Sequence, residues 1–220
     1  MIWDEFISRL ENEIDWDNTT LEECQKLEVI LKEFSRFPEQ LELRCNEIIH
    51  NDELFEAYKR HMEYPRITMD KFILHMDKDD RFRVRLHRIK AKKLNGDTVA
   101  KVHSHKWVYS TIILKGSYLE NTWDVISTDD LTEEAELKYT GSKVLKVGDT
   151  NSGLVNVAHQ TLNESDDEHC ISLFVRGRSL EDAAKIYNLE NNTFYYTYSP
   201  DEFVKMGLGY IGKLNAEFHG

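Results

Sequence analysis

The chain has 220 residues, 40% of them hydrophobic and 11% aromatic, which is enough for one packed domain with an appended subdomain and excludes a disordered chain. Its formal net charge of −12 argues against a nucleic-acid or anionic membrane surface, because both need clustered Lys and Arg. No apolar run is long enough for a transmembrane helix, and the acidic N-terminus lacks the pattern of a signal peptide. Three widely separated cysteines favour buried, reduced thiols, so we expect a cytoplasmic protein.

Residues 1–66 are predicted to form a helical subdomain. Apolar residues recur at spacings of three and four, as an amphipathic helix requires, in the segments 3–14, 19–37, 38–51 and 52–62. The Thr-Thr pair that opens the second segment can cap its helix, and Pro38 suits the first turn of the third. Asn51 or Asp52 can cap the fourth.

Residues 67–198 are predicted to form a β-barrel. From Met69 onward the apolar period changes to two, and a hairpin with its turn at 77–80 comes first. Gly, Asn and Asp then interrupt strand-like runs every 8 to 12 residues, a spacing typical of a small antiparallel barrel or sandwich. The later runs cover 98–105, 108–116, 117–127, 135–141, 143–148, 154–163, 169–177 and 192–199. A final helix over 199–220 is expected to pack on the barrel, although its glycines weaken it.

Two histidines one residue apart give the first chemical signal. A strand points alternate side chains to one face, so His103 and His105 could bind one metal ion if another strand supplied a third ligand. This spacing alone is weak, because two histidines often fall this way by chance. A second group of residues strengthens the metal interpretation. His103 and His105 lie between Gly96 and Gly116, and further along the chain Gly148 is followed by His159 and Asn163.

These spacings resemble the two motifs of the cupin superfamily, one with glycine, HxH, glutamate and glycine, the other with glycine, histidine and asparagine. The resemblance covers about residues 82–177. It implies a single double-stranded β-helix (jelly-roll) barrel, with a supporting role for Asn163. The implied metal ligands are His103, His105 and His159. The usual glutamate ligand falls at Tyr109 or Ser110, which are poor ligands for a divalent metal. A cupin barrel that binds no metal is the alternative.

A cupin without that glutamate keeps a facial triad of three neutral imidazoles, which is similar to the cysteine dioxygenases, or thiol dioxygenases. That resemblance implies Fe(II), whereas imidazole alone does not discriminate among Fe, Ni, Cu and Zn. The family's strand serine falls at Ser172, its next histidine at Phe174 and its active-site tyrosine at Arg176. Its carboxylate-binding arginine falls at Phe72, beside Lys71. The metal ligands therefore match and the substrate-binding residues do not, which argues against L-cysteine as substrate. The chain is at least as similar to uncharacterised bacterial cupins with an HxHRW-type motif.

Basic residues on the predicted hairpin could bind an anionic substrate. Arg83 and Arg85 alternate with apolar residues, so they would face into the barrel if the apolar set packed on the helices. The opposite orientation, with the basic set in solvent, is favoured for Arg83 and stays open for Arg85. Lys71 is a further candidate for substrate binding, and Trp107 shares the inward face of His105, where it would fill space or line the pocket.

Tyr109 and Arg176 are the candidate catalytic residues. Tyr109 shares the face of His105 and could donate its hydroxyl to bound oxygen or substrate. Arg176 could bind a carboxylate or stabilise superoxide. A packed tyrosine and a surface ion pair are the alternatives for these two residues. Glu120, Asp124 and Asp149 are interpreted as turn or rim residues.

The sequence thus favours a mononuclear non-haem metal cupin, a cysteine-dioxygenase-like Fe(II) oxidoreductase that oxidises a small anionic metabolite, with a thiol as one option. One alternative is a non-catalytic cupin that binds a small molecule or regulates. Another is a Zn, Ni or Mn cupin acting as an isomerase or hydrolase. The expected partners are a small-molecule substrate and O2, without nucleic acid or membrane, and a homodimer is an open option because cupins commonly dimerise.

Overall fold

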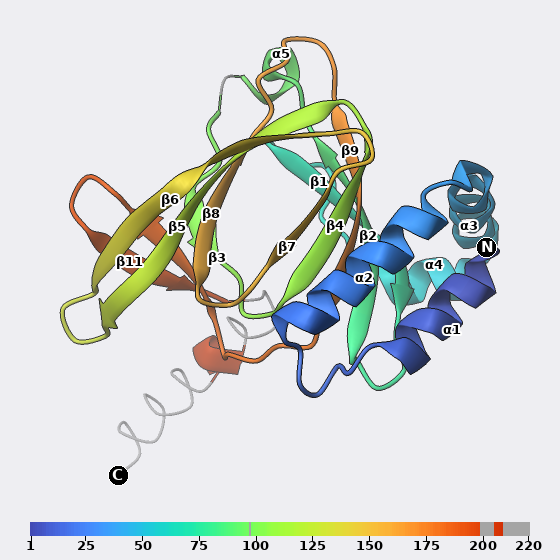
Figure 1. Cartoon of the computed structure of the whole chain (residues 1–220), viewed down its shortest axis with the longest axis horizontal. Coiled ribbons are helices and arrows are strands. Elements are labelled where there is room, and N and C mark those ends of the chain that lie inside the picture. Colours follow the sequence, from blue (N-terminus) through green and yellow to red (C-terminus); the bar gives the residue numbers. More distant parts are fainter. Residues whose placement is uncertain (97, 199–204, 209–220) are drawn as a thin grey trace.

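The computed structural model describes residues 1–96, 98–198 and 205–208, and these are mainly β (Figure 1). The helices are α1 (Trp3–Glu13), α2 (Leu21–Phe34), α3 (Pro38–His50), α4 (Asp52–Lys59) and α5 (Lys92–Asn95). The strands are β1 (Met69–Met76), β2 (Phe82–Ile89), β3 (Val102–Ser104), β4 (Tyr109–Lys115), β5 (Ser117–Asp129), β6 (Glu134–Lys146), β7 (Thr150–Gly153), β8 (Val157–Leu162), β9 (Cys170–Gly177), β10 (Ala184–Asn188) and β11 (Thr193–Thr197).

The strands form two antiparallel groups that face each other. One is a five-stranded sheet in the order β1-β2-β9-β4-β7, and the other is a closed ring in the order β10-β11-β6-β5-β8-β3. Contacts between the groups include the Tyr109 hydroxyl on β4, which lies 3.1 Å from a ring nitrogen of His159 on β8. Side chains of the five-stranded sheet and of the closed ring of strands therefore contact each other near His159.

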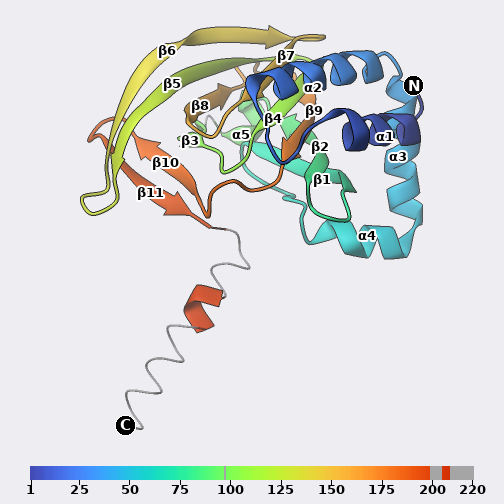
Figure 2. The same cartoon turned by 60° about the horizontal axis from the view of Figure 1, so that its bottom comes forward.

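Helices α1 to α4 lie within the four predicted helical segments and gather at one end of the molecule, away from β10 and β11 (Figure 2). The Thr20 side chain accepts from the Glu23 backbone N–H to cap α2, and the Asn51 side chain accepts from Leu54 to cap α4. Pro38 occupies the first turn of α3, where its missing N–H costs nothing.

The helices pack on one another and also share a core with the five-stranded sheet. Phe82 and Val84 of β2 are fully buried against them, and Trp16 stacks on Phe82 with ring centroids 4.9 Å apart. The apolar set of β2 thus packs on the helices. Because side chains alternate along a strand, the neighbouring Arg85 and His87 point away from the helices, toward the closed ring of strands. The basic set of β2 therefore faces inward, an orientation that the sequence left open for Arg85.

The predicted helix over 199–220 lies mostly outside the described residues. Residues 205–208 are described, and they form one helical turn with exposed side chains. In the described part of the chain, no helix combines the length and the apolar character needed to cross a membrane.

Candidate metal site

The three predicted histidines converge between β3 and β8. His103 on β3 is the direct partner of His159 on β8, and His105 follows two residues later on the same face. One nitrogen from each ring lies within 4.8 Å of the others, and the Nε2 atoms of His105 and His159 are 3.0 Å apart. Strand pairing therefore brings together ligands that are more than fifty residues apart in the sequence.

The spacing between His105 and His159 fits a metal ion. Two nitrogens about 2.1 Å from one ion, and at right angles around it, are about 3 Å apart, as in adjacent positions of an octahedral site. Two lone pairs cannot approach this closely unless a proton or a cation lies between them. The approach of His105 Nε2 to His159 Nε2 is therefore satisfied by a shared proton or by an ion.

The outer nitrogens of two rings are held by hydrogen bonds that set their tautomers. His159 Nδ1 lies 2.8 Å from a carboxylate oxygen of Glu120, and His103 Nδ1 lies 2.9 Å from the carbonyl oxygen of Lys101. Both acceptors require a proton on Nδ1, so both Nε2 atoms carry lone pairs. Histidine ligands of protein metal sites usually have such a partner, which fixes the ring and raises its basicity.

Burial keeps the rings of His103 and His105 neutral. It lowers the pKa of His103 to about 3, with a smaller contribution from His159, and it lowers the pKa of His105 far below the usual range. A positive charge on Lys71 also lowers both pKa values. At neutral pH a divalent ion would therefore displace no proton from His103.

Glu120 is the residue that sequence reasoning misplaced. The sequence predicts a rim or turn residue at this position, but Glu120 is 1% exposed, lies on β5, and contacts His159. Its other oxygen accepts from Asn151 Nδ2 at 2.6 Å, and Asn151 in turn accepts from Lys143. One sequence signal did exist, because Glu120 lies two residues after the aromatic Tyr118 on a strand whose alternate residues share a face. The other two carboxylates behave as expected, since both are exposed.

The two predicted catalytic residues lie in different surroundings. Tyr109 is buried, stacks on Phe174 with centroids 4.9 Å apart, and places its hydroxyl beside Nδ1 of His159, on the opposite side of that ring from Nε2. Burial raises its pKa well above the usual value, so the phenol stays protonated. Arg176 is 4% exposed and lies with its guanidinium 4.8 Å from the centre of the Trp107 ring.

The predicted substrate residues form a basic cluster beside the histidines. Trp107 stacks on His105 with ring centroids 5.4 Å apart. The guanidinium of Arg85 lies 5.6 Å from the centre of the same Trp107 ring. Lys71 pairs with Glu63 at 3.1 Å. Arg83 is more exposed than Arg85 and pairs with Asp80 at 2.7 Å, at the turn of the β1–β2 hairpin. Of these cations, Arg85 is the one in contact with Trp107.

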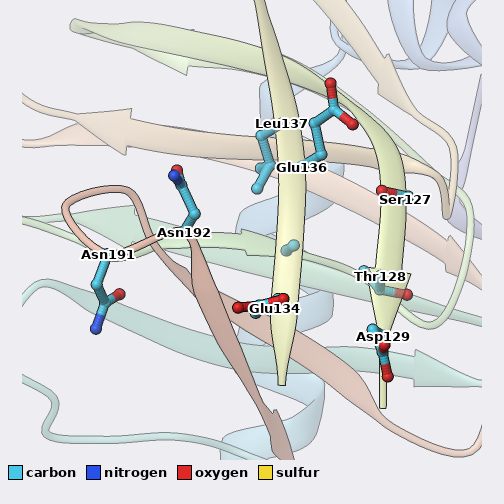
Figure 3. Close-up of a pocket in the computed structure, with 9 residues that line it drawn as sticks. Ser127, Thr128, Asp129, Glu134, Glu136, Leu137, Asn191 and Asn192 are labelled. Carbon is cyan, nitrogen blue, oxygen red and sulfur yellow. The ribbon is translucent and has the colours of Figure 1, made fainter. Parts of the chain in front are cut away.

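Other features are separate from this cluster. Asn163 holds a loop, because its amide donates to the carbonyl oxygens of Ile89 and Glu168. Figure 3 shows an open polar hollow at the far end of β5 and β6, and none of the three histidines lines it. Its lining residues are Ser127, Thr128, Asp129, Glu134, Ala135, Glu136, Leu137, Asn191 and Asn192.

No protein-family model matches the chain, and no curated protein matches it. Similar solved structures include a hydroquinone 1,2-dioxygenase in complex with Cd2+ and 4-hydroxybenzonitrile, at 11% identity and a TM-score of 0.35, over 49% of this chain and 63% of that one. An RmlC-like cupin from Shewanella frigidimarina is similar at 14% identity and a TM-score of 0.37, over 55% and 86%. A DMSP lyase from Ruegeria pomeroyi is similar at 16% identity and a TM-score of 0.35, over 53% and 50%. The chain thus spans less than two thirds of the dioxygenase and of the lyase.

Proposed function

We propose that the chain is a mononuclear metal enzyme that uses Fe(II) and O2 to oxidise a small anionic metabolite. The observation that supports this most is the convergence of three imidazoles, two of which have their outer nitrogen fixed by a hydrogen bond. Three neutral ligands would leave coordination positions open on an octahedral ion. A bound ferrous ion would supply binding and electronic activation of O2 beside the substrate.

The chain's own residues would bind and orient the reactants. His103, His105 and His159 would hold the ion, and Glu120 would keep the third ring in its binding tautomer. The basic cluster beside His105 would attract an anionic substrate and hold it next to the open positions, which supplies proximity. In a dioxygenase both atoms of O2 enter the product, so the reaction balances without an external reductant.

Metal content and O2 uptake test this proposal. Protein purified without a histidine tag should contain close to one metal ion per chain by elemental analysis, and the variant His159→Ala should contain almost none. After anaerobic loading with Fe(II), the wild type should consume O2 with at least one member of a panel of small carboxylates, phosphate esters and thiols. Labelled 18O2 should then place two oxygen atoms in the product.

Two results would overturn the proposal. Wild type and His159→Ala with the same metal content would remove the site. A fully loaded protein that consumes no O2 with any member of the panel would remove the oxidation. Asp124→Asn is the matched control, because Asp124 is an exposed carboxylate on β5, away from the histidines, and its variant should behave as wild type in both assays.

A second candidate function is a Zn-type Lewis acid that acts in isomerisation or hydrolysis. The carboxylate–histidine pair of Glu120 and His159 favours it, because this pair is also characteristic of zinc sites. Turnover of a substrate by the Zn(II) protein under anaerobic conditions would support this function over oxidation.

A further inference from the structure

Two buried arginines face one tryptophan at the edge of the candidate metal site. Arg85 on β2 is 8% exposed and Arg176 on β9 is 4% exposed. Their guanidinium carbons lie 5.6 and 4.8 Å from the centre of the Trp107 ring. Both strands belong to the five-stranded sheet, and Arg83 and Arg85 pair with Arg176 and Phe174 across β2 and β9, so both buried guanidiniums emerge on the same face.

Three buried donors of this group have no acceptor among the described residues. Arg85 Nε, Arg176 Nε and Trp107 Nε1 are all buried without a hydrogen-bond partner there. Arg176 has one good bond, from Nη1 to the carbonyl oxygen of Gly177 at 2.7 Å. A buried donor without an acceptor is costly, and a buried charge without a counter-charge costs more. Two guanidiniums with such donors face the indole that carries the third, and this arrangement indicates an acceptor from outside the chain.

Charge counting gives the valence of that acceptor. The cluster holds four cations, Lys71, Arg83, Arg85 and Arg176, and two carboxylates lie among them. Glu63 pairs with Lys71 at 3.1 Å and Asp80 pairs with Arg83 at 2.7 Å. The half-exposed Asp80 lies 3.8 Å from Arg176, too far for a hydrogen bond. Four cations with two carboxylates leave two positive charges over, because Arg85 forms no ion pair within the described residues and Arg176 only shares Asp80 with Arg83.

Burial opposes both of these charges. It lowers the pKa of Arg85 to about 10 and the pKa of Arg176 to about 9, and the second shift includes repulsion from Arg85. Both groups still carry a proton at pH 7. The fold therefore holds two repelling cations in a poorly solvated position, as expected where their partner is a bound anion.

We infer that Arg85, Trp107 and Arg176 form a subsite for a dianionic oxyanion, the charged head group of the substrate. Oxygen atoms of such a group would accept from the three orphaned donors and neutralise both guanidiniums. Trp107 also stacks on His105, so a ligand held there would present its remaining atoms to the metal side of the cluster. This inference rests on the proposed function for its biological role, but binding of the anion itself does not require a metal.

Titration of metal-free, full-length protein with inorganic phosphate tests the inference. Calorimetry at pH 7.5 and low ionic strength should show one phosphate per chain, and acetate should bind at least tenfold more weakly because it carries one charge. Malonate is the second probe, because its two carboxylates carry the same charge on a longer group. Tighter binding of phosphate would indicate a phosphate-type head group, and tighter binding of malonate a dicarboxylate.

Single variants locate the binding. Arg85→Gln and Arg176→Gln should each weaken phosphate binding by about 10- to 100-fold, as expected for loss of a hydrogen bond to a charged group. Arg178→Gln is the matched control, since Arg178 lies two residues after Arg176 but is 47% exposed and pairs with Asp17. Its affinity for phosphate should stay within twofold of wild type. Arg85→Lys, which keeps the charge and loses Nε, should fall between wild type and Arg85→Gln.

Metal binding separates this inference from the proposed function. Arg85→Gln and Arg176→Gln should bind Co(II) with wild-type stoichiometry, which also shows that they fold. His159→Ala should bind phosphate normally and lose the metal. The subsite is refuted if the wild type binds neither phosphate nor malonate, or if neither arginine variant changes the affinity. A wild-type protein that binds phosphate but no metal would instead refute only the proposed enzyme function.

Discussion

Replacing Glu120 by glutamine should weaken metal binding without touching a ligand. The carboxylate is 1% exposed and uses both oxygens as acceptors, one from His159 Nδ1 at 2.8 Å and one from Asn151 Nδ2 at 2.6 Å. A glutamine offers only one acceptor and places an NH2 group at the other position. Either His159 or Asn151 then meets a donor where it needs an acceptor.

The neighbouring residues cannot correct this mismatch by turning over an amide. Asn151 could rotate to present its oxygen to the introduced glutamine only by pointing its NH2 group at Lys143, which now donates to that oxygen. The network therefore requires two acceptors at position 120. Loss of such an outer partner typically costs 10- to 100-fold in metal affinity, or about 1.4 to 2.7 kcal/mol.

A chelator competition titration with Co(II) or Zn(II) at pH 7.5 measures this effect. We expect a 10- to 100-fold rise in Kd for Glu120→Gln and less than a twofold change for Asp124→Asn, which makes the same charge change at an exposed position of β5. Near-ultraviolet circular dichroism checks that both variants keep wild-type packing. An affinity of Glu120→Gln within twofold of wild type would show that the carboxylate does not orient His159.

Three further substitutions test the packing around the site. Asp70→Asn should cost about 1–2 kcal/mol of unfolding free energy at pH 7 in a urea titration, because it removes the pair between this buried carboxylate and the partly exposed Arg88. Burial raises the pKa of Asp70, but hydrogen bonds and nearby cations lower it by more, so the net shift is downward. The stability that the carboxylate contributes is therefore present above about pH 4 and is lost as the pH falls through the folded-state pKa. A stability difference between variant and wild type that is unchanged at pH 2 would contradict this. Phe82→Ala should lower the unfolding free energy by about 3–5 kcal/mol and leave the affinity for Co(II) unchanged, because this side chain packs on the helical side of the sheet. A parallel loss of metal affinity would show that the two faces of the sheet are not independent. Gly153→Ala should displace Tyr109, because the new Cβ would lie 2.2 Å from its ring. It should lower the unfolding free energy by about 1–3 kcal/mol. Unchanged stability and unchanged tyrosine fluorescence would show that the tyrosine ring adapts without cost.

Local patterns were sufficient to place most secondary structure and the three histidines. Apolar spacing and capping residues such as Thr20 indicate the helices because both act within a few residues of sequence. His103 and His105 could be assigned to one face because strand alternation is also local. The histidine at 159 was found only through its resemblance to a known motif, since the strand pairing that brings it to His103 is a long-range contact.

The parts that local patterns could not decide all depend on which face of a strand is buried. Alternation placed Arg85 opposite Val84, but only the helices packing on Val84 show that Arg85 points into the site. The same uncertainty hid Glu120, because a carboxylate near a strand end is usually solvated. Tyr118, two residues earlier, marks the inward face, but the partners that allow a carboxylate to be buried there, Asn151 and His159, come from two other strands.

The two halves of the proposed chemistry come from different sheets. The ring supplies His103 and His159, whereas the five-stranded sheet supplies Arg85 and Arg176. The distance between a bound ion and a bound anion therefore depends on how the sheet and the ring are held together. Tyr109 joins them directly, because its hydroxyl on the sheet side contacts His159 on the ring side. A Tyr109→Phe variant should accordingly keep both ligand sets and alter their relative position, so that metal and phosphate each bind with near-normal affinity while turnover falls; normal turnover in this variant would show that backbone packing alone sets the spacing.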